Sequence, residues 1–235
     1  MRQKAMAPRT SVIMPVRNGS LFIEEALTSV LPQLAPDDEI LVVDDASTDS
    51  TRSFLARLSD LRIHVLNGSG RGVSSARNIG LAKASGEFIA FLDHDDLWPA
   101  KRHSTMKQAL MDDPRIDAVF GRVRIRLDAG GVMWPALLNQ DGRHAPGSNL
   151  GNALYRSKAL RQIEGFDEAL HFGEDLDYFD RLLKAGIRFG LCDVDGLIYR
   201  RHESNVTNDQ DAMMNMHFNL IRRRTARASL RKPVR

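Results

Sequence analysis

Between residues 10 and 92, short apolar runs alternate with longer segments in which apolar residues recur every three or four positions. Short runs of this kind predict buried strands, and the recurring pattern predicts amphipathic helices. Because this alternation favours parallel strands joined by right-handed crossovers, we expect an α/β fold: a Rossmann-like, mainly parallel sheet flanked by helices. The expected strands are 11–14, 39–43, 62–66 and 88–92, and the expected helices are 21–34, 50–58 and 74–84. The first of these helices would place Phe22, Ala26, Leu27, Val30 and Leu34 on one buried face.

After residue 98 the pattern changes. A helix is expected at 101–111, a strand at 118–127 and a further short strand at 188–192. The strand at 118–127 is followed by a segment rich in Gly, Pro and Asn from 128 to 151. This segment is too long for an ordinary connection and is typical of a lid or an acceptor-binding flap. Trp134 within it could stack on a substrate or could anchor the loop to the body.

Each of the four expected strands runs directly into polar residues, namely 15–19, 44–49, 67–72 and 93–96. The carboxyl ends of parallel strands meet at one edge of an open sheet, where ligands bind. We therefore expect the four polar segments to converge on a common ligand.

The last of these segments, Asp93-His94-Asp95-Asp96, concentrates carboxylates after an apolar run. Adjacent carboxylates repel one another, and their hard oxygen atoms suit Mg²⁺ or Mn²⁺ that is also held by substrate phosphates. Alternatively, Asp96 caps a helix that begins near Pro99, and the other acids are solvated turn residues. The convergence of the strand ends favours the metal site.

Residues 68–73, Gly-Ser-Gly-Arg-Gly-Val, suggest a dinucleotide-binding fingerprint. Val73 stands where the third glycine should be, and the motif follows the third strand instead of opening the fold, so this interpretation is rejected. Flexible backbone beside a phosphate-bearing ligand explains the glycines equally well. Arg77 could pair with a diphosphate there or could be an ordinary surface arginine.

A second acidic segment, residues 173–177, precedes a helix expected to bury Phe179, Leu182 and Leu183. Asp175 would lie near the helix N-terminus, which favours the ionised form that can accept a proton, although simple capping is an alternative. Later in the chain, His202 is flanked by cations. It could be a metal ligand, a hydrogen-bond donor to phosphate or a surface histidine.

The net charge of the 235 residues is +3, and the end of the chain carries more than this excess. The cations of this tail are Arg222, Arg223, Arg224, Arg227, Arg231, Lys232 and Arg235. Such a tail is either solvated or attached to an anionic membrane surface, and the lack of interleaved aromatic residues argues against nucleic acid.

Cys192, the single cysteine, excludes disulfides within one chain and is expected to be a buried, inert thiol. With no apolar run long enough for a membrane span and no signal-like start, we expect a cytoplasmic protein.

Six segments in order form a highly specific set: VIMPVRNG (12–19), VVDDASTD (42–49), ARN (76–78), LDHDD (92–96), GFD (165–167) and GED (173–175). On these motifs the chain resembles a family 2 glycosyltransferase with the GT-A, or nucleotide-diphospho-sugar transferase, fold. The resemblance covers roughly residues 11–207. It implies a single domain, 10–207, between an N-terminal tail, 1–9, and a C-terminal helix and basic tail, 208–235. Its nucleotide-binding half would be 10–97, and its acceptor-binding half, 98–207, would form a C-terminal α+β extension.

The resemblance also implies site roles. Asp175 corresponds to the catalytic base. Asp95 would hold Mn²⁺ or Mg²⁺ directly, with Asp93 and His202 on the metal side. Arg17 departs from the more usual tyrosine, which leaves the nucleobase preference open. The implied donor-binding residues are Pro15, Val16, Arg17, Asp45, Arg77, Asp93 and His94.

The implied activity is metal-dependent, inverting transfer of a sugar from a nucleotide-diphospho-sugar, expected to be a UDP-sugar, to a hydroxyl acceptor. The acceptor would be a sugar or a lipid-linked molecule in cell-surface glycan or glycolipid synthesis. The absence of the Gln-X-X-Arg-Trp signature argues against a processive synthase. Two alternatives are a non-catalytic sugar-nucleotide-binding protein and, ranked below it, a nicotinamide-dependent oxidoreductase.

Overall fold

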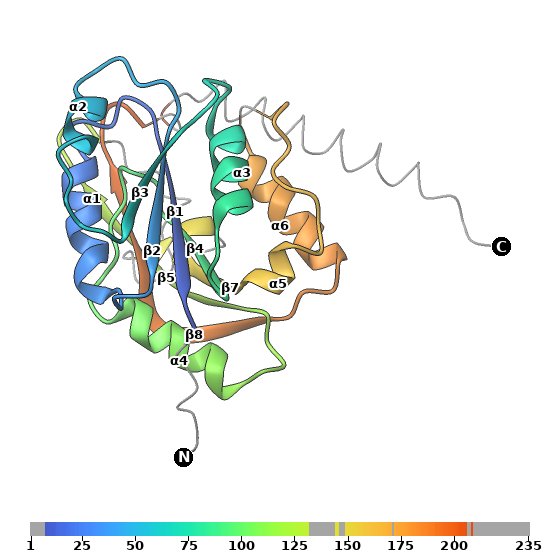
Figure 1. Cartoon of the computed structure of the whole chain (residues 1–235). Helices are drawn as coiled ribbons and strands as arrows, with labels where there is room; N and C mark the ends of the chain where they lie inside the picture. Colours follow the sequence, from blue (N-terminus) through green and yellow to red (C-terminus); the bar gives the residue numbers. More distant parts are fainter. Residues whose placement is uncertain (1–7, 132–143, 146–148, 171, 206–207, 209–235) are drawn as a thin grey trace.

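The structure is a computed structural model that describes residues 8–131, 144–145, 149–170, 172–205 and 208. In this part of the chain, eight strands form one sheet in the order β3-β2-β1-β4-β7-β5-β6, and β8 pairs with β5 (Figure 1). The strands are β1 (Thr10–Val16), β2 (Glu39–Asp44), β3 (Ile63–Asn67), β4 (Phe88–Phe91), β5 (Ala118–Leu127), β6 (His144–Ala145), β7 (Ala153–Arg156) and β8 (Phe189–Arg201). The helices are α1 (Ile23–Val30), α2 (Thr51–Leu55), α3 (Val73–Lys83), α4 (Arg102–Asp112), α5 (Ser157–Leu160) and α6 (Glu174–Lys184), with short 3-10 turns at Leu31–Gln33 and Leu150–Asn152.

Helices cover both faces of the sheet, which explains why β1, β2 and β4 are buried along their whole length. Alternate side chains of β1 enter different cores. Met14 packs with residues of α1, α2 and α4, whereas Ile13 packs with residues of α5 and α6 on the opposite face. Figure 1 shows α1 and α2 on one side of the sheet and α3, α5 and α6 on the other.

The first four strands are parallel, as the sequence predicts. β1 pairs with β2 on one side and with β4 on the other, and β3 lies outside β2. The chain therefore reverses its winding direction between β1 and β4, and the crevice beyond their carboxyl ends is the expected place for a ligand. The α/β fold class is confirmed.

The second half makes the sheet mixed. β7 is antiparallel to β4 and β5, and β8 is parallel to β5. The strand expected at 188–192 is only the start of β8, which continues to Arg201. Near its end, Ile198 exchanges backbone hydrogen bonds with Leu97 at 3.1 and 2.9 Å. This contact brings the end of β8 to the segment that follows the acidic residues after β4.

Several local expectations are wrong. The helix predicted at 21–34 is shorter, and Phe22 precedes it instead of belonging to its buried face. Leu183 is exposed, because α6 buries Tyr178, Phe179 and Leu182 instead. Asp96 does not cap a helix near Pro99, since α4 begins at Arg102. Cys192 is partly buried, and this burial raises the pKa of its thiol.

Other expectations lie outside the described residues: most of the loop at 128–151 with Trp134, the start of the N-terminal tail, and the basic C-terminal tail. Within the described part of the chain, no helix has the length and apolar character needed to span a bilayer.

Gly80 is where α3 lies against β1. A Cβ atom at this position would come within 2.4 Å of Cγ2 of Ile13. We expect Gly80→Ala to lower the free energy of unfolding by about 1–3 kcal/mol, because overpacking outweighs the gain in helix propensity of about 1 kcal/mol. Urea unfolding followed by circular dichroism measures the change. The exposed control Lys83→Ala should change stability by less than about 0.5 kcal/mol. Equal stability of Gly80→Ala and wild type would contradict the close packing.

Candidate active site

The loops that follow β1 and β2 are bonded to each other at the carboxyl edge of the sheet. Asn18, with φ of 53°, accepts a hydrogen bond from the backbone of Thr48 at 2.8 Å, and its own backbone donates to Ser47 at 2.9 Å. Pro15 and Val16 are buried at the end of β1, and Arg17 is exposed just beyond it. These residues lie together at the carboxyl edge of the sheet, where a ligand is expected.

Asp45 follows β2 and faces the glycine-rich loop before α3. Its carboxylate accepts hydrogen bonds from the backbone of Gly70 and of Gly72, both at 2.7 Å. Gly70 and Gly72 have φ of 72° and 98°, conformations that favour glycine. In a dinucleotide-binding fold a pyrophosphate would occupy the N-terminus of the helix that follows such a loop. Here the carboxylate of Asp45 already accepts hydrogen bonds from two backbone N–H groups of the loop, which supports rejection of the dinucleotide fingerprint.

Arg77 is a buried cation on α3, not the surface arginine that the sequence left as an alternative. Its guanidinium donates to both carboxylate oxygens of Asp93, at 2.8 and 3.1 Å, and to Glu174 at 2.7 Å. It also lies 5.5 Å from the centre of the Phe166 ring. Although burial lowers the pKa of Arg77, Asp93 and Glu174 raise it overall. Arg77 thus joins the acidic segment after β4 to the acidic segment that opens α6.

Asp95 and His202 meet although 107 positions separate them, with Nε2 of His202 lying 3.3 Å from Oδ2 of Asp95. Nδ1 of His202 lies 2.9 Å from the hydroxyl of Ser204, and its ring stacks on Phe22 with centroids 4.2 Å apart. Burial alone would raise the pKa of Asp95, but the hydrogen bond with His202 and the nearby His94 hold it below its ordinary value.

Phe22, which the sequence analysis assigned to a buried helix face, therefore supports the imidazole. His94 is half-buried and packs against Gly19, where a Cβ atom would come 2.3 Å from Cδ2 of the imidazole.

The donor set of Asp95 and His202 fits a divalent cation that is shared with a substrate. A carboxylate oxygen and an imidazole nitrogen suit Mn²⁺, and Mg²⁺ typically keeps one or two protein carboxylates and takes its other ligands from phosphates and water. Within the described ranges there is no group of three or more His, Cys, Asp or Glu side chains placed to hold a metal. Both oxygens of Asp93 face Arg77, so the structure brings Asp95 and His202 together without bringing Asp93 to them as a third ligand.

Asp96 is buried beneath this pair, and its carboxylate accepts a hydrogen bond from the backbone of Arg200 at 3.0 Å. Burial, together with the charges of Asp95 and Asp93, raises the pKa of Asp96 well above its ordinary value.

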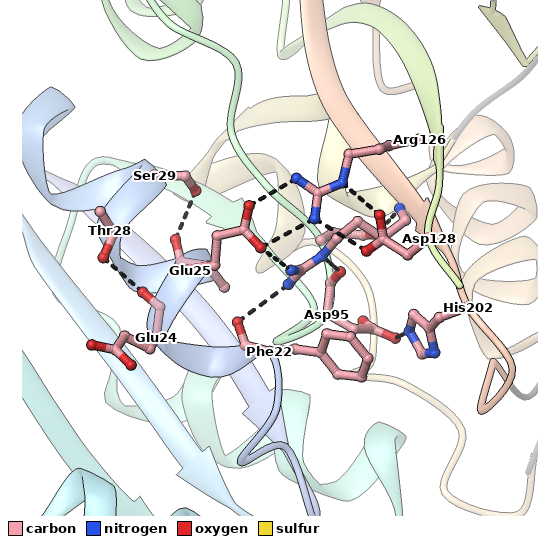
Figure 2. Close-up of polar contacts among 12 residues, drawn as sticks. Phe22, Glu24, Glu25, Thr28, Ser29, Asp95, Arg126, Asp128 and His202 are labelled. Atoms are coloured by element: carbon pink, nitrogen blue, oxygen red, sulfur yellow. Dashed lines mark hydrogen bonds and ion pairs between the residues drawn. The ribbon is translucent and has the colours of Figure 1, made fainter. Parts of the chain in front are cut away.

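The side chain of Arg200, also buried, pairs with Glu25 at 2.6 Å and bonds the backbone carbonyl of Asp95. Figure 2 shows the carboxylate of Glu25 bonded to Arg126, and Asp95 and His202 close to Phe22. Sequence reasoning noticed Arg200 only as a cation next to His202 and missed Glu25; charge alternation gave no signal for so distant a pair.

Asp175 lies in the first turn of α6, directly after Glu174 and behind Gly173, whose φ is 72°. It is half-buried, and one oxygen accepts a hydrogen bond from the backbone of Leu176 at 2.8 Å. Burial and the adjacent Glu174 raise the pKa of Asp175 to about 6, and Arg77 opposes this shift. Asp175 is therefore ionised at neutral pH and is more basic than an exposed carboxylate. This combination suits a proton acceptor.

Comparison with solved structures places this geometry in a known fold. Staphylococcus aureus TarS, residues 1–349 in complex with UDP-GlcNAc, has a TM-score of 0.67 at 24% identity, over 86% of this chain and 61% of that chain, and shows the fold alone. The mannosyltransferase PcManGT from Pyrobaculum calidifontis, in complex with GDP-Man and Mn²⁺, has a TM-score of 0.57 at 25% identity, over 80% of this chain and 57% of that chain.

Curated relatives agree. The chain is 41% identical over 116 residues to the Escherichia coli UDP-Glc:alpha-D-GlcNAc-diphosphoundecaprenol beta-1,3-glucosyltransferase WfgD, covering 49% of this chain and 46% of the relative. It is 29% identical over 223 residues to the uncharacterized glycosyltransferase EpsJ of Bacillus subtilis strain 168, covering 86% and 64%. The chain thus spans about half to two thirds of the length of these relatives. The model of the family described as glycosyl transferase family 2 matches residues 11–167, more than half of the chain, and the protein therefore belongs to glycosyltransferase family 2.

Proposed function

We propose that the protein is a metal-dependent, inverting glycosyltransferase that moves a sugar from a UDP-sugar to a hydroxyl group of a sugar or a lipid-linked acceptor. The observation that carries the proposal is the placement of two acidic centres on either side of Arg77. Asp95 with His202 suits a cation, and Asp175 suits a proton acceptor. The name of WfgD supports a UDP-sugar donor and a lipid-diphosphate acceptor, and the name of PcManGT supports Mn²⁺.

In this proposal the crevice beyond β1 and β4 binds the donor. Pro15, Val16 and Asp45 line the nucleobase, with Arg17 at its exposed edge. Asp93 and His94 contact the donor, with Asp93 fixed by Arg77. A bound Mn²⁺ or Mg²⁺, held by Asp95 and His202, would supply positive charge for the leaving diphosphate.

Asp175 takes the proton from the acceptor hydroxyl, whose oxygen attacks the anomeric carbon on the face opposite the leaving group. The carbon–oxygen bond to the nucleoside diphosphate breaks as the new glycosidic bond forms, which inverts the configuration. Arg77 contributes by holding Glu174, and with it the first turn of α6, in place.

A donor panel tests the nucleotide part of the proposal. UDP-, GDP- and dTDP-sugars are added with and without Mn²⁺, and the melting temperature is measured; a UDP-sugar with Mn²⁺ should raise it most, since bound ligand stabilises according to its saturation. Asp95→Asn should lose the part of the increase that depends on Mn²⁺. Asp60→Asn, which removes an ion pair with Arg62 instead, is the matched control. The proposal fails if no nucleotide sugar shifts the melting temperature.

The same panel, followed by incubation of radiolabelled donor with lipid extract, separates catalysis from binding. Saturable binding with no labelled product would favour the non-catalytic sugar-nucleotide-binding protein. Binding of NAD(H) without divalent metal would favour the oxidoreductase.

Asp175→Asn should lower the transfer rate by at least about a hundredfold, because general base catalysis contributes 10² to 10⁴. Its melting temperature at pH 7.5 should equal or exceed that of wild type, since the raised pKa means that the ionised carboxylate is destabilised by burial. Asp180→Asn, farther along α6, is the matched control and should transfer at the wild-type rate. Near-normal turnover by Asp175→Asn under chemistry-limited conditions would remove the base assignment.

The pH profile of wild type checks the same residue. A base with a pKa of about 6 is ionised above that value, so kcat should be constant at pH 7–8 and should fall as pH decreases through about 6. An ordinary aspartate would keep the rate constant down to about pH 4. A flat profile between pH 5 and 8 would contradict the raised pKa.

Asp45→Asn tests the contact between Asp45 and the glycine loop. The amide nitrogen of Asn cannot accept a hydrogen bond, so Gly70 or Gly72 loses its partner, at a cost of about 1–3 kcal/mol. Hydrogen exchange at residues 69–72 should become faster, and UDP binding should weaken if the loop shapes the nucleotide site. Unchanged exchange would show that the carboxylate does not hold this loop.

A further inference from the structure

The segment that carries Asp95 is held from one side by β8 and α1. β8 ends beside it, and the backbone groups of Ile198 and Leu97 bond each other in both directions. Two residues after Ile198, the backbone of Arg200 donates to the carboxylate of Asp96 at 3.0 Å. The acidic segment is thus attached to β8 at two successive points.

The side chain of Arg200 adds a third attachment. Its Nε bonds the carbonyl of Asp95, and its Nη2 lies 3.5 Å from the carbonyl of His94. Arginine has five donors in a rigid planar group, so it can bind several carbonyls at once and fix their relative positions. Arg200 is 1% exposed, which removes competition from solvent.

Arg200 is itself anchored at the N-terminus of α1. Nη1 donates to Glu25 at 2.6 Å and Nη2 donates to the carbonyl of Phe22 at 3.2 Å. The ring of Phe22 lies 5.0 Å from the guanidinium carbon and stacks on His202. Arg200 therefore contacts the segment of Asp95, and Phe22, to which Arg200 is bonded, contacts the ring of His202 (Figure 2).

We propose that Glu25 and Arg200 are positioning residues that hold Asp95 and His202 at the spacing required for a shared divalent cation. Neither side chain touches the cation in this proposal. Glu25 neutralises and orients Arg200, and Arg200 orients the backbone that carries Asp95. The inference rests on the proposed function for the identity of the ligand, a divalent cation with a nucleoside diphosphate, but the positioning itself is a property of this chain.

Arg126 provides a matched control. It donates to Glu25 at 2.7 and 3.1 Å, as Arg200 does, but its other partner is Asp128 instead of the acidic segment. Arg126→Gln removes ion pairs from the same carboxylate without removing a contact to residues 93–96. A purely structural role of Glu25 would make Arg126→Gln and Glu25→Gln equivalent.

The experiment measures the affinity for Mn²⁺ in the presence of UDP, by electron paramagnetic resonance of free Mn²⁺, for full-length wild type, Glu25→Gln, Arg200→Gln and Arg126→Gln. Loss of a residue that orients a metal ligand costs about 10- to 100-fold in metal affinity. We expect this weakening for Arg200→Gln, a smaller one for Glu25→Gln, and a change of less than about twofold for Arg126→Gln. Saturating Mn²⁺ should restore turnover by Glu25→Gln.

Hydrogen exchange at residues 93–97, measured without metal or nucleotide, is the second readout. It should become faster in Glu25→Gln and Arg200→Gln and stay unchanged in Arg126→Gln. Wild-type Mn²⁺ affinity together with unchanged exchange in Glu25→Gln would overturn the inference. Glu25 is half-exposed, so this variant decides the matter even if Arg200→Gln does not fold.

Failure of the proposed function gives a different result. Wild type would then show no Mn²⁺-dependent UDP binding and no transfer, and hydrogen exchange alone would decide: faster exchange at 93–97 in Glu25→Gln would support positioning, and unchanged exchange would overturn it.

Discussion

The proposed active site depends on one buried cation. Arg77 lies between Asp93 and Glu174, which come from opposite halves of the chain and would otherwise repel each other. A buried ion pair often adds little net stability, but removal of one partner leaves uncompensated charge and is strongly destabilising. Arg77 therefore acts mainly on geometry: it fixes α6 relative to the segment after β4. The two acidic segments of the proposed site keep their relative position because they share one guanidinium.

A second buried arginine, Arg200, holds the acidic segment from the other side of Asp95. Arg200 satisfies backbone carbonyls of the acidic segment, and Glu25 balances its charge. Asp96, beneath them, is held by a backbone N–H, and the raised pKa of its carboxyl favours the neutral form. The acidic segment, residues 93–96, therefore does not carry the full negative charge of its three aspartates. Asp95, whose pKa is held below its ordinary value, stays ionised.

The parallel half of the fold could be predicted from the sequence because β1, β2 and β4 are buried on both faces and are therefore continuous apolar runs. β8 could be predicted only at its start, 188–192, since the polar residues that follow, such as Asp195, pair with arginines of β5 and interrupt the apolar pattern. The motif residues Asp45, Asp95 and Asp175 were predictable because they follow strands or open a helix.

Arg200 and Glu25 were not predictable as a pair. Arginine is rarely fully buried, so a sequence pattern assigns it to the surface. The ion pair joins positions 175 residues apart, and only the path of β8 along β5 and past Leu97 brings them together. Local periodicity contains no information about such a contact. The burial of Arg77 escaped prediction for the same reason.

The commitment of Arg77 to two carboxylates also constrains the chemistry. Its Nη1 and Nη2 already serve Glu174 and Asp93, and its Nε is buried without a hydrogen-bond partner, so turning the guanidinium toward a diphosphate would weaken one of these ion pairs in a partly buried site. The negative charge of a leaving diphosphate therefore needs another source of compensation. In the proposed mechanism Asp95 and His202 hold a cation on the donor side, whereas Asp175, whose pKa is raised despite the proximity of Arg77, remains basic on the other side. If Arg77 turned fully toward the donor, Glu174 would raise the pKa of Asp175 further and the base would lose its ionised form near neutral pH. Fixing Arg77 between its two acids thus keeps the proposed metal site and the proposed base separate.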